Sequence, residues 1–388
     1  MTKRRVRMPQ NPDVPPEENT GLYDVQRLAD YLGVKPATVR TLKKRHQVPA
    51  PTAENINGGA VWRAGDVKSF YAPSEKRVSQ SEPEPDGPSV IDLFAGCGGL
   101  SRGFRNAGYN VLAGYDNWDP AIRTYNHNLP ERAYKLDLSD VDLTIRTIEA
   151  SGFCFDGIIG GPPCQDFSSA GKRKEGARAD LTEKYATIVA HFRPSFFVME
   201  NVARAKTATA FRHAVEILTE AGYGITEHVL NAAYCGVPQA RKRLITVGFL
   251  NGNMDNEFEE YLTAHLSDRP MTVRNYFGES LGTQYYYRHP RSYARRAVFS
   301  IDEPSPTIRG VNRPVPQGYP GHPGDAAPVS EARPLTTVER ARIQTFEDFE
   351  FLGSKTDVEQ LIGNAVPVNL AKYVGASVRS YLADNLTA

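Results

Sequence analysis

Four short apolar segments, separated by stretches with helical periodicity, constrain the fold of this chain more than any other feature. The segments read SVIDLF, NVLAGYD, FDGIIGG and SFFVMEN, and each is followed by or ends in glycine or polar residues. Apolar runs of this length, alternating with amphipathic helices, are typical of strands buried in a parallel sheet. The pattern predicts an α/β fold with a doubly wound sheet and places a ligand site at the carboxyl ends of the strands.

Length and cysteine content limit the class of protein further. The chain has 388 residues, enough for two or three domains, and its apolar runs are interrupted before the roughly 18 residues that a membrane span needs. No apolar segment follows the basic amino terminus, so we expect a soluble, cytoplasmic protein that is not secreted. Its cysteines lack the CxxC spacing, which predicts neither disulfide bonds nor a bound metal. They are Cys97, Cys154, Cys164 and Cys235.

Composition divides the chain into parts. The stretch SEKRVSQSEPEPDGPS predicts a linker, and a later region rich in Tyr, Arg, Pro and Gly predicts an irregular domain. After that region, PLTTVERARIQTF has the capping-box spacing from Thr336 to Glu339 and predicts a helix that returns to the main domain. The expected boundaries are residues 1–73 for an amino-terminal module, 74–88 for the linker, 89–250 for the main domain, 251–330 for the irregular domain and 331–388 for the returning segment.

The amino-terminal module is predicted to contain a helix, a turn and a second helix. In YDVQRLADYLGVKPATVRTLKKR, the helical periodicity breaks at a glycine and restarts at Pro36. Residues 1–80 carry 14 lysines and arginines against 8 aspartates and glutamates, and we expect Arg40, Lys43 and Lys44 to project from the second helix. The segment resembles the winged helix-turn-helix of the MerR and excisionase families, which implies DNA binding. A basic helical interaction module is the alternative.

A glycine-rich turn follows the first strand of the main domain. In VIDLFAGCGGLSRGF, Gly96, Gly98 and Gly99 let backbone amides approach a ligand, and the amino terminus of the next helix favours negative charge. Asp116 ends the second strand about twenty residues later, where a carboxylate can accept hydrogen bonds from a ribose. The pattern predicts a nucleotide-like cofactor, although many tight turns of this kind bind nothing.

Cys164 lies in a rigid frame, GGPPCQDFSSAGKR. Pro162 and Pro163 fix two φ angles, and the preceding strand ends at the same edge of the sheet as the glycine-rich turn. An unperturbed thiol is mostly protonated at neutral pH, so nearby positive charge would be needed to raise its thiolate fraction. Free cysteines are often buried as small apolar residues, but this context favours a nucleophile.

Six segments occur in the order of the signature motifs of DNA cytosine-5 methyltransferases. They read DLFAGCGGLSRGF, GGPPCQDFS, MENV, QARKR, RPLTTVERARIQTF and IGNAVPVNLA. The chain therefore resembles this family over residues 89–380, and the amino-terminal module lies outside the resemblance. The family resemblance implies a Rossmann-like methyltransferase sheet, S-adenosylmethionine as cofactor, and double-stranded DNA as substrate. The region 251–330 corresponds to the family's target-recognition domain.

The resemblance implies a catalytic set for methylation at C5 of cytosine. The Cys164 thiolate would add to C6 and make C5 nucleophilic. Glu200 would serve N3 of the ring as proton donor, and Arg241 or Arg243 would hold O2 and stabilise the thiolate. Asn201 would order the turn at Glu200. A base inside a duplex cannot reach these groups, so the cytosine would be flipped out.

The resemblance also implies residues for the cofactor and for DNA. Trp118 would stack on the adenine and Asp137 would bind its amino group, unless both are surface or capping residues; Asn117 stands where relatives often have an apolar or aromatic residue. The cofactor set is Phe94, Gly96, Cys97, Gly98, Asp116, Asn117, Trp118, Asp137, Leu138, Pro163, Asn364 and Val366. The DNA set does not come from the resemblance as a whole: Arg40, Lys43 and Lys44 come from the predicted second helix of the amino-terminal module. An alternative for several arginines of region 251–330 is that they only hold loops together. The DNA set is Gln165, Ser168, Lys172, Arg173, Arg288, Arg291, Arg296, Thr307, Arg309, Arg313, Arg40, Lys43 and Lys44.

Several of these interpretations have alternatives. The basic segment after Cys164 is expected to close over DNA, but an ordinary solvated loop has the same composition. One branch of the family methylates tRNA, so RNA is a second candidate substrate. The amino-terminal module is alternatively a repressor that binds an operator. We expect a monomer in catalysis and a restriction-modification or epigenetic context, with a cognate restriction endonuclease as a candidate partner.

Overall fold

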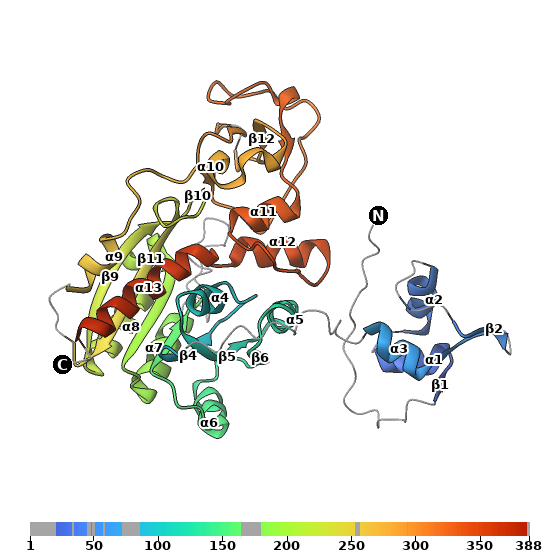
Figure 1. Cartoon of the computed structure of the whole chain (residues 1–388), viewed down its shortest axis with the longest axis horizontal. Helices are drawn as coiled ribbons and strands as arrows, with labels where there is room; N and C mark the ends of the chain where they lie inside the picture. The colour runs from blue at the N-terminus through green and yellow to red at the C-terminus, as the bar shows by residue number, and fades with distance from the viewer. Residues whose placement is uncertain are drawn as a thin grey trace. The chain divides into compact units, whose positions relative to one another are not determined.

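The computed structural model describes residues 21–32, 35–44, 48, 51–56, 59–71, 86–163, 180–252, 257–292 and 294–385. The chain divides into two compact units, residues 1–83 and residues 84–388, each with its own core (Figure 1). No helix in the described ranges combines the length and the apolar character that a membrane span requires.

The described part of the first unit contains three helices and a small antiparallel sheet. Its elements are β1 (Leu22–Tyr23), α1 (Val25–Leu32), α2 (Pro36–Lys44), β2 (Ala53–Ile56), β3 (Gly59–Arg63) and α3 (Ala64–Tyr71), and the strand order is β1-β3-β2. Asp24 begins α1, since its carboxylate accepts a hydrogen bond from Arg27 N at 2.8 Å. Leu28, Val39 and Trp62 are buried in one apolar cluster, which holds both helices against the sheet.

The second unit is built on a seven-stranded sheet with the order β6-β5-β4-β7-β8-β11-β9. The strands are β4 (Ser89–Leu93), β5 (Asn110–Asp116), β6 (Arg132–Lys135), β7 (Gly157–Gly160), β8 (Phe196–Val202), β9 (Tyr223–Asn231) and β11 (Lys242–Leu250). The pairs among β6, β5, β4, β7 and β8 are parallel, whereas β11 is antiparallel to both neighbours. The prediction of an α/β fold with a mostly parallel sheet is confirmed.

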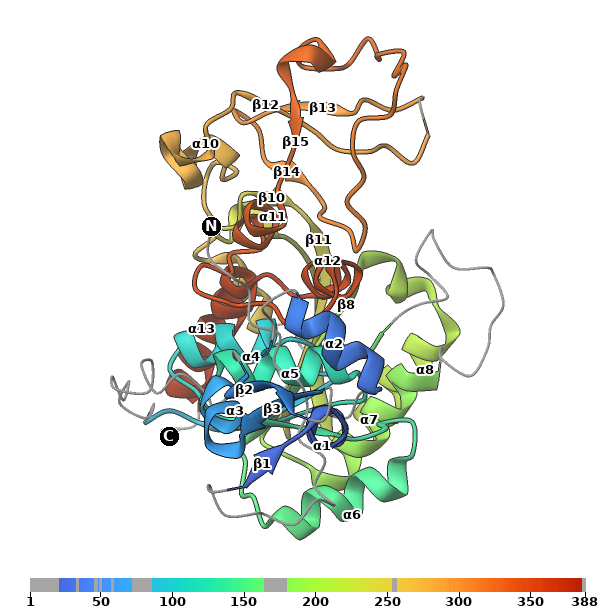
Figure 2. The same cartoon turned by 90° about the vertical axis from the view of Figure 1, so that its right-hand side faces the viewer.

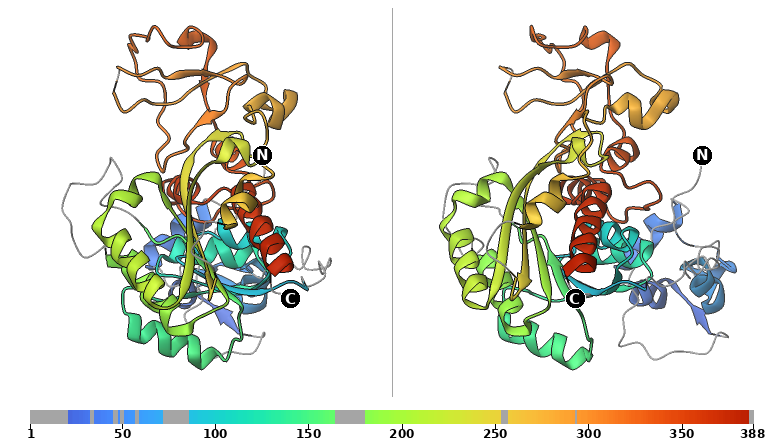
Figure 3. Two further views of the ribbon diagram at one scale, coloured as in Figure 1. Left: turned by 90° about the vertical axis from the view of Figure 1, so that its left-hand side faces the viewer. Right: turned by 60° about the vertical axis from the view of Figure 1, so that its left-hand side comes forward.

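Helices cover both faces of this sheet (Figure 3). Successive residues of one strand face opposite layers: Phe196 belongs to the apolar core under α4 and α13, and Phe197 to the core under α7 and α8. Both side chains are fully buried, so the strand reads as a continuous apolar run. The helices are α4 (Gly99–Asn106), α5 (Asp119–Asn128), α6 (Val141–Ser151), α7 (Asp180–Phe192), α8 (Thr209–Glu220), α9 (Glu257–Thr263) and α13 (Val368–Asn385), with 3₁₀ turns η2 (Ala203–Thr207) and η3 (Ala232–Tyr234).

A smaller, less regular part follows β11. Figure 2 shows its strands β12, β13 and β15 together, at the opposite end of the unit from α6. Its elements are α10 (Val273–Phe277), η4 (Gly278–Leu281), β12 (Tyr285–Tyr287), β13 (Val298–Ser300), β14 (Ser305–Pro306), η5 (Val329–Glu331) and β15 (Arg333–Pro334). The strands form a sheet of order β13-β12-β15, while β14 pairs with β10 (Gln239–Ala240) beside the main sheet.

Two further helices, α11 (Thr337–Ile343) and α12 (Lys355–Asn364), lead back to the main sheet. The predicted capping box is confirmed: Thr336 N donates to Glu339 Oε2 at 2.7 Å, and Glu339 N donates to Thr336 Oγ1 at 3.2 Å. The chain then enters α13, which packs directly against α4. A layer of the main domain is therefore supplied by the last twenty or so residues, far from α4 in sequence.

Gly103 sets the distance between α4 and α13. A Cβ atom at this position would lie 2.3 Å from Ala371 Cβ and 2.6 Å from Val368 O. The obstructing atoms include helix backbone, which cannot rotate out of the way. Close contact between the two helices therefore requires glycine here.

We predict that Gly103→Ala lowers the free energy of unfolding by about 1–3 kcal/mol, the usual range for overpacking a core. On an open helix surface the same change would stabilise, because alanine has the higher helix propensity. Asn106→Ala, at an exposed position of the same helix, serves as the control and should stay within about 0.5 kcal/mol of the unsubstituted protein. Urea unfolding followed by circular dichroism measures both. Equal stability of the two variants would contradict the packing argument.

Candidate active site

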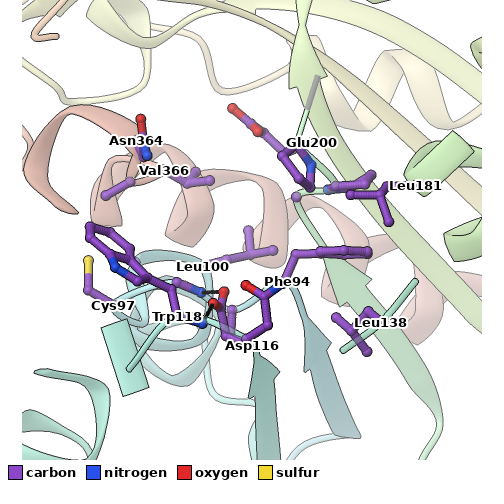
Figure 4. Close-up of a pocket in the computed structure, with 18 of the residues that line it drawn as sticks. Phe94, Cys97, Leu100, Asp116, Trp118, Leu138, Leu181, Glu200, Asn364 and Val366 are labelled. Carbon is purple, nitrogen blue, oxygen red and sulfur yellow. Dashed lines mark hydrogen bonds between the residues drawn. The ribbon is translucent and has the colours of Figure 1, made fainter. Parts of the chain in front are cut away.

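A cavity of about 1220 Å³ opens at the carboxyl ends of β4, β5, β7 and β8. It is lined by the glycine-rich turn, the ends of the neighbouring strands and the segment between α12 and α13, and Figure 4 shows side chains from all three sources converging on it. The predicted residues in its lining are Phe94, Gly96, Cys97, Asp116, Asn117, Trp118, Asp137, Leu138, Pro163, Glu200, Asn201, Arg241, Arg243, Asn364 and Val366. The structure thus brings together residues that are up to 272 positions apart in sequence.

Asp116 connects the glycine-rich turn to the second strand. Its carboxylate accepts hydrogen bonds from Gly96 N at 2.8 Å and from Trp118 N at 2.9 Å. Burial raises the pKa of Asp116, and the backbone hydrogen bonds oppose that rise. Phe94 and Gly96 both have positive φ, 60° and 56°, so the turn is sharply bent where it lines the cavity.

Gly98 is a predicted cofactor residue that does not line the cavity; its neighbour Gly99 does. Gly98 has a φ of 92°, and a Cβ atom there would lie 2.5 Å from Leu129 Cδ1, so it shapes the turn from behind. Cys97 lies in the wall, where burial raises the pKa of its thiol to about 12. This thiol therefore stays protonated at neutral pH, as expected of a wall residue.

Trp118, Asp137 and Leu138 also line the cavity. Figure 4 shows Trp118 beside Cys97 on one side of the cavity and Leu138 on the other. Asp137 accepts a hydrogen bond from Ser139 N at 3.0 Å, and the hydrogen bonds from Ser139 lower the pKa of Asp137. Sequence reasoning missed several apolar lining residues, because nothing in a helix-opening leucine marks it as facing a ligand. They are Leu100, Leu136, Leu143 and Leu181.

Glu200 and Arg243 form an ion pair at the cavity. Glu200 lies in β8 and Arg243 in the adjacent antiparallel strand β11, and Arg243 Nε is 2.7 Å from Glu200 Oε1. Both side chains are largely buried, at 11% and 13% exposure, so the pair is shielded from bulk water. A carboxyl group and a guanidinium group are thereby held side by side, facing the space where a planar ligand can enter.

Asn201 fixes the chain that approaches this pair. Its Nδ2 donates to Pro162 O at 3.5 Å, and its Oδ1 accepts from Val202 N at 2.8 Å. The described chain reaches the cavity at Pro163. The predicted site residues Cys164, Gln165, Ser168, Lys172 and Arg173 lie outside the described residues.

Arg241 is used differently from Arg243. Its side chain is buried, and its guanidinium donates to Ile308 O at 3.3 Å, to Gly363 O at 3.3 Å and to Ala365 O at 3.1 Å. Burial lowers the pKa of Arg241, and the neighbouring cation Arg243 lowers it further. The QARKR segment therefore supplies one arginine that faces Glu200 and one that binds backbone carbonyls.

Most of the predicted DNA-contacting arginines lie in the small part after β11. Arg288 donates to Thr307 O at 2.7 Å, Arg309 donates to His289 O, and Arg291 and Arg313 are exposed. Burial lowers the pKa of Arg309, and the cations Arg291 and Arg313 lower it further. The hydrogen bonds of Arg288 and Arg309 hold residues 288–289 beside residues 307–309. A basic cluster therefore forms around Thr307.

Arg296 does not join this cluster. Its guanidinium pairs with Glu303, with Nη1 2.9 Å from Oε1, and lies 4.4 Å from the centre of the Phe299 ring. In the first unit, Arg40 and Lys43 lie on α2, with Arg40 exposed. The side chain of Lys44 is outside the described residues.

A buried hydrogen-bond network supports the glycine-rich turn from below. Asp92 Oδ2 accepts from Ser101 Oγ at 2.6 Å and from Ser101 N at 3.1 Å, and Tyr125 Oη donates to Ser101 Oγ at 2.9 Å. Asp92 is fully buried, and this burial raises the pKa of Asp92 to about 8. Its second oxygen, Oδ1, has no hydrogen-bond partner among the described residues, so this oxygen can carry the proton.

Together, the fold and the cavity define a cofactor-dependent α/β enzyme with a carboxyl–guanidinium pair beside its cofactor cleft. The chain belongs to the C-5 cytosine-specific DNA methylase family, whose model matches residues 89–380. It is a DNA (cytosine-5-)-methyltransferase, and its methyl donor is S-adenosylmethionine. The described lining suits this donor: the Asp116 carboxylate lies beside a glycine-rich turn in a cleft of sufficient size.

Relatives of this chain include proteins named Type II methyltransferases. It is 53% identical over 295 residues to the Type II methyltransferase M.HgiDI of Herpetosiphon aurantiacus, covering 76% of this chain and 94% of the relative. It is 50% identical over 295 residues to the Type II methyltransferase M.HindV of Haemophilus influenzae, covering 75% and 96%. A solved prophage-encoded putative DNA modification methyltransferase from E. coli shares the fold, with a TM-score of 0.60 and 22% identity over 76% of this chain and 100% of the other.

The raised pKa of Asp92 predicts a pH-dependent stability. The unfolded chain releases this proton near the ordinary value of 3.8, whereas the folded protein retains it up to about 8. Stability contributed by the protonated form is therefore lost as the pH rises through this window, by up to ~1.4 kcal/mol per pH unit. Asp92→Asn cannot ionise, so its stability relative to the unsubstituted protein should increase from pH 5.5 to 7.5. Urea unfolding across this range tests the expectation, and a difference independent of pH would contradict it.

Proposed function

We propose that this enzyme methylates C5 of a cytosine flipped out of double-stranded DNA, through a covalent bond between Cys164 and C6. The observation that carries the proposal is the buried Glu200–Arg243 pair, 2.7 Å apart, beside the cavity that the chain reaches at Pro163. A positioned acid and a positioned guanidinium are what a pyrimidine ring needs at N3 and O2 when a nucleophile adds to C6.

The residues would divide the reaction as follows. The Cys164 thiolate bonds to C6, Glu200 supplies a proton toward N3, and Arg243 donates to O2, so the electrons released into the ring reach C5. S-adenosylmethionine supplies the methyl group as an electrophilic sulfonium. The C5 proton then leaves to solvent and the bond between C6 and Cys164 breaks. N3 gives its proton back to the Glu200 carboxylate, so the neutral cytosine ring, the acid and the thiolate are all regenerated. Asn201 orients this site through Pro162.

Arg241 is the weaker of the two candidates for O2. Its two terminal nitrogens already donate to three backbone carbonyls, whereas Arg243 faces the carboxylate that would bind the same ring. Removing Arg241 from those carbonyls would leave buried acceptors without partners, which is costly. We therefore assign ring binding to Arg243 and a structural task to Arg241.

For the cofactor, we assign the ribose to Asp116 and the adenine end of the cavity to Trp118, Asp137 and Leu138. The adenosine-binding role of Asp116 is supported by its position at the end of β5, 2.8 Å from Gly96 N of the turn. Asn364 and Val366 would form the wall next to Trp118, where Figure 4 shows them. The remaining assigned wall residues are Phe94, Gly96, Cys97, Asn117 and Pro163.

For DNA, we assign the target-recognition domain to residues 251–330 and the phosphate contacts to the exposed arginines Arg291 and Arg313. Flipping a base costs a few kcal/mol, which contacts of this kind offset. Thr307 and Arg309 lie in the same cluster and are placed to reach the duplex. The ion pair of Arg296 with Glu303 favours a loop-supporting role for this residue instead. Gln165, Ser168, Lys172 and Arg173 complete the proposed DNA set.

We further propose that residues 1–73 form a winged helix-turn-helix that adds DNA affinity, joined by a linker over residues 74–88. The order of elements supports it: two helices, α1 and α2, precede the hairpin β2–β3 and a third helix. A restriction-modification role is supported by the Type II naming of M.HgiDI and M.HindV. On this proposal the catalytic domain comprises residues 89–250 together with residues 331–388.

The covalent mechanism makes a sharp prediction for Cys164→Ser. A serine hydroxyl is far less nucleophilic at neutral pH, so methyl transfer should fall by roughly 10³-fold or more. Bisulfite sequencing of DNA from cells that produce each form reports activity and the target sequence together. Duplexes with 5-fluorocytosine at that target should trap the unsubstituted enzyme in a denaturation-resistant complex, because fluorine cannot leave C5 as a proton does.

Full activity of the serine variant would refute the covalent step. Methyl incorporation into tRNA, with none into duplex DNA, would transfer the proposal to an RNA substrate. Retention of DNA binding by Cys164→Ser is the accompanying control, since the change removes a reacting atom and no charge from the interface.

The amino-terminal proposal is tested by reversing charge on α2. Arg40→Glu with Lys43→Glu in the full chain should weaken DNA binding by about tenfold or more and reduce its salt dependence, because two phosphate contacts are lost. Arg132→Glu with Arg146→Glu gives the same change in net charge at exposed positions of the second unit outside the cavity. Fluorescence anisotropy with labelled duplex compares the two pairs. Equal affinity of the two double variants would show that the amino-terminal module does not bind DNA. A sequence-specific footprint that depends on Arg40 and Lys43 would favour the alternative that the module is a repressor that binds an operator.

A further inference from the structure

The segment of residues 307–309, which follows β14 (Ser305–Pro306), is held by side chains at consecutive backbone groups. Arg288 donates to Thr307 O at 2.7 Å, and Ile308 N donates to Gln239 Oε1 at 2.9 Å. Arg241 donates to Ile308 O at 3.3 Å. The next carbonyl, that of Arg309, accepts a hydrogen bond from Arg340, which is itself paired with the buried Glu359. The backbone here is therefore bound to the protein interior, although the side chain of Arg309 belongs to the basic cluster.

The same guanidinium group of Arg241 also binds the wall of the cofactor cavity. Its terminal nitrogens donate to Gly363 O and to Ala365 O, the carbonyls on either side of Asn364. Asn364 lines the cavity. A single buried side chain thus joins Ile308, which lies between the proposed DNA-binding residues Thr307 and Arg309, to the end of α12, which forms one wall of the cofactor site.

Two glutamines make a second connection between the same two segments. Gln239, which accepts from Ile308 N, donates through Nε2 to Gln344 Oε1 at 2.6 Å. Gln344 Nε2 then donates to Ile362 O at 2.6 Å and to Ala365 O at 3.1 Å. Both glutamine side chains are fully buried, so water cannot replace these bonds without opening the structure.

The backbones of the two segments, at Gly363 and at residues 309–310, are also in direct contact. A Cβ atom at Gly363 would lie 2.1 Å from Gly310 N and 2.3 Å from Arg309 C. The last turn of α12 and residues 309–310 are therefore packed main chain against main chain. A shift of either segment has to move the other or break several buried hydrogen bonds, each costly to leave unmade.

We propose that Arg241, with the Gln239–Gln344 pair, couples DNA recognition to cofactor binding. Arg241 is on this account a positioning residue. DNA bound at Thr307 and Arg309 fixes the segment of residues 307–309, and this segment fixes the end of α12 at Asn364 through Arg241. The cofactor then binds more tightly. Thermodynamic linkage makes the effect reciprocal, so bound cofactor strengthens DNA binding by the same factor. The inference rests on the proposed function, in which Thr307 and Arg309 bind DNA.

The test measures the dissociation constant of S-adenosylhomocysteine with and without duplex carrying the site mapped by bisulfite sequencing. In the unsubstituted protein the duplex should tighten this constant by about fivefold or more, within the usual range of coupling between sites. In Arg241→Lys the ratio should fall toward one, because a compact ammonium group cannot bridge carbonyls on two segments. Arg379→Lys is the matched control, since Arg379 also donates to a carbonyl, that of Ala107, but lies outside the cavity lining.

Gln344→Met provides an independent variant that keeps side-chain volume and removes the second connection, and it decides the matter if Arg241→Lys does not fold. Hydrogen exchange in the unsubstituted protein gives a third readout: adding S-adenosylhomocysteine should slow exchange of the Ile308 and Gly310 amides. The inference is overturned if the duplex does not tighten binding, if both folded variants keep the full ratio, or if these amides do not respond. Failure of the proposed function is distinct, since it would show as absent DNA methylation.

Discussion

The burial of one guanidinium group determines how the carboxyl-terminal third of this molecule is arranged. Arg241 is 2% exposed, and a cation removed from water must be surrounded by acceptors. The acceptors are carbonyls of Ile308, Gly363 and Ala365, which come from two segments that are more than fifty residues apart. The chain that leaves the sheet after β11 is thereby brought back to the edge where the cofactor cavity opens, and α13 follows as the last layer over α4.

Much of the fold could be predicted because local pattern and tertiary environment agree. Ile158 and Ile159 are adjacent, both fully buried, and face opposite layers, so a continuous apolar run indicated a strand covered on both sides. Asp116 and Glu200 could be predicted as site residues for a related reason. The strands that carry them are parallel members of one sheet, so their carboxyl ends lie at one edge. This prediction requires no knowledge of the loop conformations.

Other features depend on contacts that sequence spacing does not contain. Arg241 and Arg243 are two residues apart and chemically identical, yet one binds carbonyls and the other faces Glu200. Gln344 sits in a helix-ending segment with no sign of its buried partners. Arg296 satisfies the composition of a DNA-binding loop but is paired with Glu303 within its own domain. In each case the deciding partner lies on another strand or loop, whose approach the pattern of a single segment cannot specify.

The glycine-rich turn shows where the structure concentrates its strain. Phe94 has a φ of 60°, a conformation that costs a non-glycine residue of order 1–3 kcal/mol. It is kept there by its neighbours: Ala95 N donates to Tyr115 O at 3.0 Å, and Gly96 N donates to the Asp116 carboxylate at 2.8 Å. Below the turn, the burial of Asp92 is a second cost in the free energy of folding. The hydrogen bonds of Asp92 with Ser101 fix the start of α4. Because one cost falls on the wall of the cavity and the other on the layer that supports it, the turn is rigid before any ligand arrives, and binding need not supply the free energy to shape it.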